Sequence, residues 1–148
     1  MKIQMPSRKR GFTLVELMIV AVIVAILAAV AIPLMSANKS RAMMTEAESA
    51  LGMLKSTMQT VYAASGAYNV DQNGNTISTG SITNIPGVST NDVAGRWFNA
   101  PAYALTTVTS NTFLFTATGN NSTTSNATQV AGLVVTLDQM GNFVRTGY

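Results

Sequence analysis

Side chains with useful chemistry are scarce in this sequence of 148 residues. It contains no cysteine and no histidine, which excludes disulfides and thiolate metal sites and removes the commonest general base. Asp71 opens a stretch that resembles a calcium loop, but glycine stands at its fourth position and Ile82 at its twelfth. A polar turn at Asn73-Gly74 is the better interpretation. We therefore expect a protein that is not an enzyme and needs no cofactor or metal.

The most informative acidic residue is Glu16, because it lies inside an apolar segment. Residues 12–35 (FTLVELMIVAVIVAILAAVAIPLM) are apolar apart from Thr13 and Glu16. As a helix rising 1.5 Å per residue, this segment is long enough to cross a hydrocarbon core of ~30 Å. A carboxylate at the centre of a membrane helix costs ~2.5–3.5 kcal/mol and is seldom left unpaired. Glu16 therefore needs a partner; the alternative is a glutamate near the interface that is protonated or snorkels.

The charges are few and unevenly placed. Only 10% of the residues are charged, against 47% hydrophobic, and the formal net charge is +3. Of the nine basic residues, four precede residue 11, so the five basic and six acidic residues that follow it, Glu16 included, leave a net charge of −1. This asymmetry predicts a single-pass membrane protein with a cytoplasmic N-terminus. No clustered basic face indicates direct nucleic-acid binding. The four early basic residues are Lys2, Arg8, Lys9 and Arg10.

The junction before the apolar segment reads Lys9-Arg10-Gly11-Phe12-Thr13-Leu14-Val15-Glu16-Leu17. It resembles the type III signal of bacterial type IV prepilins and type II secretion pseudopilins. Glycine has no side chain, so a protease can approach its backbone closely. Cleavage after Gly11 leaves the apolar helix attached, unlike cleavage of an ordinary secretory signal. The resemblance implies that a prepilin peptidase cuts between Gly11 and Phe12 and then N-methylates the new amine of Phe12.

The resemblance also implies an assembled state. Glu16 would pair with the Phe12 amine of a neighbouring subunit and set the axial register of a filament. Pro33 falls where the family has its helix proline, which implies a kink that loosens on packing. The expected partners are identical subunits in a helical filament, the prepilin peptidase, an inner-membrane assembly platform and the inner membrane itself. The precursor would lie in the inner membrane and the product in an extracellular pilus, with adhesion or twitching motility as the family's activities.

The remaining sequence predicts an α+β fold of four parts. These are a leader (1–11), a membrane and filament-core helix (12–35), an amphipathic helix half (36–65) and a β head with a preceding loop (66–148). An apolar stripe with steps of three or four marks the amphipathic part, and Ser65-Gly66 ends it. The stripe is Ala47, Leu51, Leu54, Met58 and Val61. Two helices broken near Pro33 are the alternative to one continuous helix.

An antiparallel sheet of about four strands is expected to cover the amphipathic helix. The strands are predicted as two hairpins, and residues 119–129 as a polar loop. Trp97-Phe98 should anchor the long loop on the core. Many major pilins close their C-terminal loop with a disulfide, so this cysteine-free tail must be held by strand pairing or by filament neighbours. The predicted strands are Tyr103–Thr109, Thr112–Thr118, Leu133–Asp138 and Phe143–Arg145.

The favoured function is a structural subunit of a type IV pilus, as a major pilin or pilin-like protein. A type II secretion pseudopilin is the nearest alternative. An exported soluble protein whose ordinary signal peptide is cut near Met35-Ser36-Ala37 is a second. The mature N-terminus separates the exported soluble protein from the two pilin-like alternatives. It would be Asn38 in the exported protein and methylated Phe12 in a pilin or pseudopilin.

Overall fold

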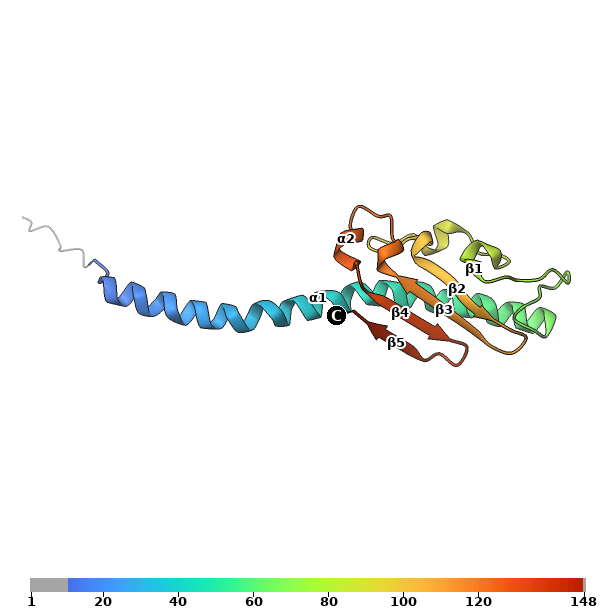
Figure 1. Ribbon diagram of the computed structural model, residues 1–148, viewed down its shortest axis with the longest axis horizontal. Helices are drawn as coiled ribbons and strands as arrows, with labels where there is room; N and C mark the ends of the chain where they lie inside the picture. Colours follow the sequence, from blue (N-terminus) through green and yellow to red (C-terminus); the bar gives the residue numbers. More distant parts are fainter. Residues whose placement is uncertain (1–10, 148) are drawn as a thin grey trace, which may run out of the picture. The chain divides into compact units, whose positions relative to one another are not determined.

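The computed structural model describes residues 11–147 and divides the chain into two compact units, Met1–Ser36 and Ala37–Tyr148. Helix α1 (Leu14–Ser65) begins in the first unit and ends in the second (Figure 1). It continues through Pro33, so the alternative of two separate helices is wrong. Gly66 ends the helix with a positive φ of 78°, and its N–H donates to the carbonyl of Tyr62 at 2.8 Å. This is the predicted glycine C-cap.

The described part of the first unit, residues 11–36, is mostly an apolar helix without a core of its own. Its large apolar side chains are 52–79% exposed from Phe12 to Met35. Such a segment is helical because a helix satisfies its internal backbone N–H and C=O groups without water. Of the residues that the structure describes, those of α1 form the one helix long and apolar enough to cross a membrane.

The second unit contains a five-stranded sheet in which every neighbouring pair is antiparallel. The predicted antiparallel sheet is confirmed, and β1 is a short fifth strand that the sequence did not reveal. The spatial order follows the chain, so each strand lies beside the next one in sequence (Figure 1). The strands are β1 (Gly80–Ser81), β2 (Tyr103–Val108), β3 (Phe113–Thr118), β4 (Val134–Asp138) and β5 (Phe143–Thr146).

The two predicted hairpins are present. The turn between β2 and β3 is closed by Thr109, whose N–H donates to the carbonyl of Thr112 at 2.9 Å. The turn between β4 and β5 is closed by Gly141, which donates to the carbonyl of Asp138 at 3.1 Å and has a φ of 98°. Since only glycine adopts that conformation readily, the turn depends on residue 141.

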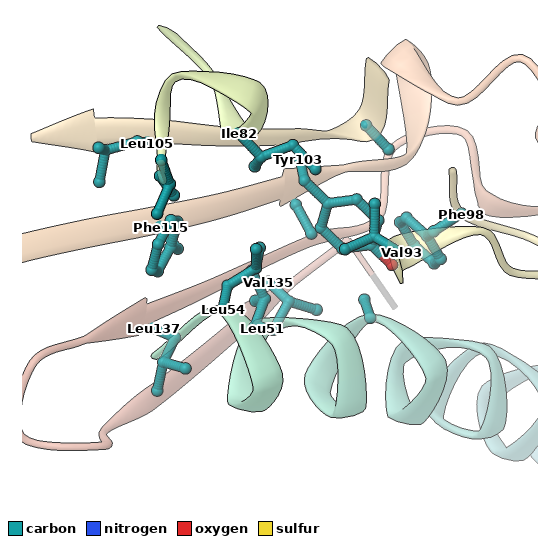
Figure 2. Close-up of a cluster of buried hydrophobic side chains, with 14 of the residues drawn as sticks. Leu51, Leu54, Ile82, Val93, Phe98, Tyr103, Leu105, Phe115, Val135 and Leu137 are labelled. Carbon is teal, nitrogen blue, oxygen red and sulfur yellow. The ribbon is translucent and has the colours of Figure 1, made fainter. Parts of the chain in front are cut away.

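The apolar stripe of α1 packs against the inner face of the sheet. All five predicted stripe residues are buried, as are Met43 and Met44 one turn earlier, which the prediction missed. Alternate residues of β2, β3 and β4 supply the facing side chains (Figure 2). A helix laid on one face of a sheet buries the apolar stripe of the helix and that face together. The facing residues include Leu105, Phe115, Val135 and Leu137.

The segments outside the sheet are more ordered than predicted. Residues 119–129 were expected to be a plain loop, but they contain η4 (Gly119–Asn121) and the start of α2 (Ala127–Val130). The reason is that buried Val130 and Gly119 pack together: a side-chain carbon on Gly119 would lie 1.8 Å from the carbonyl oxygen of Val130. The loop before β2 carries three further short helices, η1 (Ile82–Asn84), η2 (Thr90–Val93) and η3 (Ala100–Ala102).

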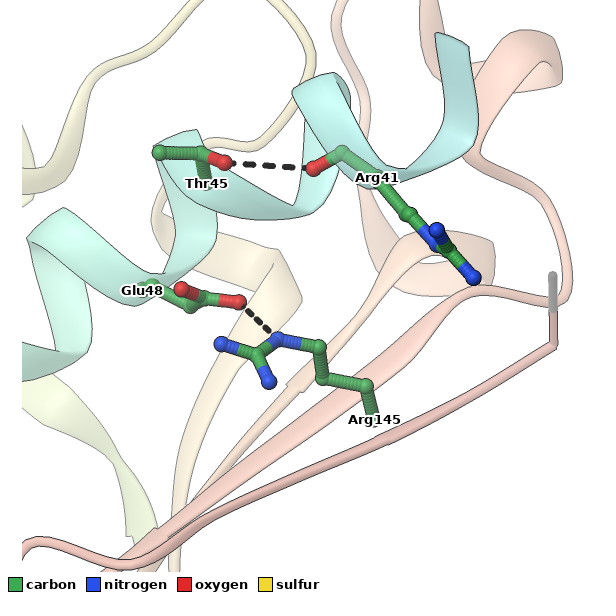
Figure 3. Close-up of polar contacts among 4 residues, drawn as sticks. All are labelled: Arg41, Thr45, Glu48 and Arg145. Carbon is green, nitrogen blue, oxygen red and sulfur yellow. Dashed lines mark hydrogen bonds and ion pairs between the residues drawn. The ribbon is translucent and has the colours of Figure 1, made fainter. Parts of the chain in front are cut away.

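The cysteine-free tail is held by more than strand pairing. Ser122 Oγ donates to the carbonyl of Trp97 at 2.6 Å, and Thr123 N–H donates to Asn99 Oδ1 at 3.0 Å. On β5, Arg145 pairs with Glu48 of α1 (Figure 3). Phe98 is fully buried, and Trp97 packs against the core, so the predicted anchoring of the loop is confirmed.

Candidate processing and assembly site

The predicted cleavage junction is uncovered where the structure describes it. Gly11 and Phe12 are both exposed, and a side-chain carbon added to Gly11 would meet nothing within 4 Å. Both residues precede the helix, which begins at Leu14. A backbone outside regular structure suits a protease, because its N–H and C=O groups are not committed to a helix. The predicted leader lies outside the described residues, apart from Gly11.

Thr13 and Glu16 form a reciprocal pair at the start of α1. Glu16 Oε2 accepts the backbone N–H and the hydroxyl of Thr13, each at 2.8 Å. In return, the backbone N–H of Glu16 donates to Thr13 Oγ1 at 3.3 Å. The carbonyl of Thr13 accepts the first helical hydrogen bond, from Leu17 at 3.2 Å. This arrangement is a capping box, in which two unpaired N–H groups at a helix start are satisfied by side chains.

The capping box explains why the helix begins immediately after the junction. The sequence analysis missed it, although threonine followed three residues later by glutamate, before an apolar run, is its usual signature. Phe12 and Leu17 occupy the flanking positions at which an apolar pair often accompanies such a cap. The carboxylate of Glu16 therefore already has partners within its own chain.

The candidate site residues do not all lie together. Thr13 and Glu16 are in contact, and Phe12 is the neighbour of Thr13 in the chain. Pro33 lies further along the same helix, about 25 Å away at 1.5 Å per residue. Any role of Pro33 is therefore separate from processing at Gly11 and Phe12.

The two acidic turns of the second unit are explained by local hydrogen bonds. Asp71 Oδ1 accepts the N–H groups of Asn73 and Asn75, both at 2.8 Å, and the predicted polar turn is confirmed. Hydrogen bonds from Asn75 lower the pKa of Asp71. Asp138 forms the same kind of turn, and bonds from Asn142 lower its pKa. In residues 11–147, no three acidic side chains gather as a metal site would require.

Comparison with known proteins identifies the N-terminal segment. Residues 6–32 match the family model described as the prokaryotic N-terminal methylation motif. The fimbrial protein EcpB of Eikenella corrodens is 39% identical over 64 residues, which are 43% of this chain and 40% of that protein. The fimbrial protein EcpC of the same organism is 40% identical over 63 residues, 43% of this chain and 41% of EcpC. The chain thus matches less than half of the length of these relatives.

Among solved structures, the non-core minor pilin PilV of Neisseria meningitidis is similar to this chain with a TM-score of 0.48 and 20% identity. The similarity covers 75% of this chain and 90% of that one. The match to the family model includes the junction, the capping box and most of the apolar segment described above. The chain thus carries the prokaryotic N-terminal methylation motif and is similar, over less than half of its length, to fimbrial proteins.

Proposed function

We propose that this protein is a structural subunit of a type IV pilus, which polymerises through its N-terminal helix. The observation that carries the proposal is an apolar helix segment whose large side chains are exposed from Phe12 to Met35, within a match to the N-terminal methylation motif. Exposed apolar surface of this extent requires either lipid or protein around it. Both environments serve in turn: the inner membrane holds the precursor, and the packed helices of identical subunits surround it in the extracellular filament.

Processing comes first in this scheme. The basic leader keeps the junction at the cytoplasmic face, and the prepilin peptidase cuts between Gly11 and Phe12. The same enzyme methylates the new amine of Phe12. The apolar helix remains on the mature protein, so that the inner-membrane assembly platform can lift it into the filament.

Glu16 then takes part in assembly. In the filament core, water is excluded, and a buried carboxylate is stabilised only by a close positive partner. The amine of Phe12 from a neighbouring subunit is such a partner. Because Glu16 holds Thr13 of its own chain at the same time, the pair would fix both the helix start and the axial register. The role is structural rather than catalytic.

Fractionation of cells tests the proposal. The wild-type chain should be recovered in the sheared extracellular fraction with methylated Phe12 at its N-terminus. Gly11→Glu should leave full-length precursor in the membrane and no sheared filament, since a bulky charged side chain would obstruct the protease. Gly52→Ala, a glycine substitution in the helix of the second unit with open space around it, is the matched control and should be processed normally.

The outcome also separates the alternatives. A mature N-terminus at Asn38 would contradict the proposal and support an ordinary signal peptide. Methylated Phe12 on a protein that is never sheared from the surface, combined with a secretion defect on deletion, would identify a type II secretion pseudopilin instead.

A further inference from the structure

The turn between β4 and β5 presents an apolar side chain to solvent. In the described part of the second unit, three large apolar side chains are exposed, and Met140 is the most exposed of them at 78%. The other two are Tyr62 and Val144. The turn is closed by bonds between Asp138 and Gly141, so it does not need the side chain of Met140. A methionine side chain adapts readily to a partner surface, because it is unbranched and flexible.

A pocket of about 280 Å³ lies in the same unit, between the last turns of α1 and two loops. Val61 and Ala64 of α1 and Pro86 of one loop supply apolar wall, and we call this the Val61 pocket. The hydroxyls of Thr57 and Thr60 also line it, but each donates to a carbonyl of α1 at 3.2 Å and needs no polar ligand. Since a water molecule takes about 30 Å³ in the liquid, the pocket has room for a side chain of methionine's length.

The turn and the pocket are different surfaces of the second unit. The β4–β5 turn adjoins one edge of the sheet, and β1 forms the other edge (Figure 1). The loops of the Val61 pocket, residues 71–73 and 86–87, flank β1 in the sequence. Met140 does not line this pocket, so the pocket of one copy is open to Met140 of another. Such a contact between unlike surfaces of identical copies is heterologous, and it propagates into a helical filament unless it closes a ring.

Charges beside the two surfaces are complementary. A side-chain carbon on Gly141 would lie 2.6 Å from Lys55 Nζ, so the ammonium lies next to the turn. No ion pair joins Lys55 to another residue in the range 11–147. The carboxylate of Asp138 accepts the N–H groups of Gly141 and Asn142 within the turn itself. The described residues of the Val61 pocket include the acidic Asp71 and no basic side chain. Lys55 of one copy is therefore suited to Asp71 of another.

We propose that Met140 of one copy of this chain inserts into the Val61 pocket of a second copy, with Lys55 of the first copy facing Asp71 of the second. The inference rests on the proposed function, because it describes a contact between subunits of a filament. Removal of the exposed methionine from water favours the association, and methionine is enriched in protein interfaces. The contact runs from turn to pocket in one direction, so every copy can repeat it.

Disulfide trapping in assembled filaments tests the contact, because the chain has no cysteine of its own. Cells express the full chain with both Met140→Cys and Ala64→Cys, and the sheared filaments are oxidised with diamide and run on a non-reducing gel. A disulfide requires two Cα atoms within about 7 Å of each other. The double variant should therefore give a ladder of covalent multimers. Each single variant should give none, because the contact joins the turn of one copy to the pocket of the next.

A second cysteine pair is the matched control for trapping. Ser56 is exposed on α1 but does not line the Val61 pocket. The chain with Met140→Cys and Ser56→Cys should therefore assemble but give no ladder. This control separates a specific contact of Met140 with the pocket from random oxidation of exposed cysteines.

A pair of variants without cysteine measures the contribution of Met140 to assembly. Met140→Gln keeps the length of the side chain but makes it polar. The ratio of sheared to membrane-retained subunit should fall about ten-fold, which corresponds to ~1.4 kcal/mol for each contact. Val144→Thr makes an exposed side chain of the same hairpin polar and should leave the ratio unchanged.

Three results would overturn the contact while wild-type filaments keep the proposed function intact. The first is a Met140–Ala64 cysteine pair that gives no more multimers than the Met140–Ser56 pair. The second is a wild-type filament level from Met140→Gln, and the third is an equal loss from Val144→Thr. The last two decide alone if the cysteine variants do not assemble. Absence of filaments from the wild-type chain would instead contradict the proposed function, and the contact with it.

Discussion

Glu46 on α1 and Phe98 before β2 lie 52 residues apart in the chain, yet the carboxylate of Glu46 accepts the backbone N–H of Phe98 at 2.8 Å. The same carboxylate accepts the N–H groups of Arg96 and Trp97. One helical side chain thereby fixes three consecutive peptide groups of the loop. The bonds place the fully buried ring of Phe98 in the core, next to Tyr103.

Loss of the Glu46 carboxylate should destabilise the second unit. Glu46→Ala leaves three backbone N–H groups without their acceptor, and we expect the free energy of unfolding to fall by about 2–4 kcal/mol. Urea denaturation of a fragment that starts near Ser36 measures this. Ser49→Ala, on the exposed side of the same helix, should change the value by no more than about 0.5 kcal/mol. Equal stability of both variants would show that the loop is held by other contacts.

Two glycines should respond in opposite directions to alanine. A side-chain carbon on Gly95 would lie 2.3 Å from Glu46 Oε1 and 2.8 Å from the carbonyl oxygen of Phe98, so Gly95→Ala must displace the loop. We expect a loss of roughly 1–3 kcal/mol. Gly52 sits in the middle of α1 with nothing within 4 Å of such a carbon. Gly52→Ala should raise the free energy of unfolding by up to about 1 kcal/mol. Thermal melts measure the change in stability of the two variants. A stabilised Gly95→Ala would refute the close packing of Gly95 against Glu46 and Phe98.

A charge in the apolar stripe should be far more harmful than one beside it. Leu54 is fully buried against the sheet, so Leu54→Asp places an unpaired carboxylate in the core and should cost several kcal/mol. Ser56, two residues later, is exposed, and Ser56→Asp should be nearly neutral. Circular dichroism melts compare the variants. An unchanged melting temperature for Leu54→Asp would mean that the stripe does not pack on the sheet of its own chain.

Variants of the capping box can separate helix initiation from subunit register. Glu16→Gln keeps a side chain that can complete the box but removes the negative charge. Thr13→Ala keeps the charge but removes the hydroxyl, with an expected cost of about 1 kcal/mol to the helix start. If charge pairing with the Phe12 amine of a neighbour sets the register, Glu16→Gln should be inserted and cleaved but assemble poorly. Thr13→Ala should assemble much better.

The ratio of sheared to membrane-retained subunit measures this difference. Glu16→Ala loses both the capping box and the charge that would pair with a neighbouring subunit, so it should resemble Glu16→Gln in assembly. Co-expression of wild type with either Glu16 variant should partly restore filaments, because each carboxylate serves a neighbouring subunit. Wild-type filament levels from Glu16→Gln alone would rule out the register mechanism and leave Glu16 as a helix cap.

Acid should loosen the β4–β5 turn. Hydrogen bonds from the backbone and side chain of Asn142 lower the pKa of Asp138 from its ordinary value of 3.8. A carboxyl whose pKa is lower in the folded state stabilises that state fully above the unfolded pKa, and the contribution is lost as pH falls through the folded pKa. The stability that Asp138 gives to the turn should therefore be constant near neutral pH and should decrease only as the pH falls below 3.8. Chemical shifts of the Gly141 and Asn142 amides, followed against pH, test this, and Asp138→Asn should abolish the dependence.

Local patterns of sequence account for much of this protein. The apolar run of residues 12–35, the stripe from Ala47 to Val61 and the hairpin turns rest on spacings of a few residues, and the structure contains the helix and strands that they predict. The Thr13–Glu16 capping box is equally local and could have been recognised from its spacing. Helix caps and amphipathic stripes can be predicted because interacting side chains are neighbours in the sequence.

Contacts over long separations were decided only by the tertiary structure. Glu46 bonds to backbone N–H groups some 50 residues away, and nearly every residue carries such a group, so no residue type marks the partner. A pocket lined by Glu46, Gly95 and Tyr103 depends on the same contact, because Glu46 and the loop that it holds form part of the pocket wall. The short β1 likewise depends on its pairing with β2, and the helices of residues 119–130 depend on the packing of Gly119 against Val130 and on bonds to residues 97–99. The spacing of residue types along the chain predicts which helices and strands form. The contacts between those elements are determined by which backbone and side-chain groups come together in the folded core.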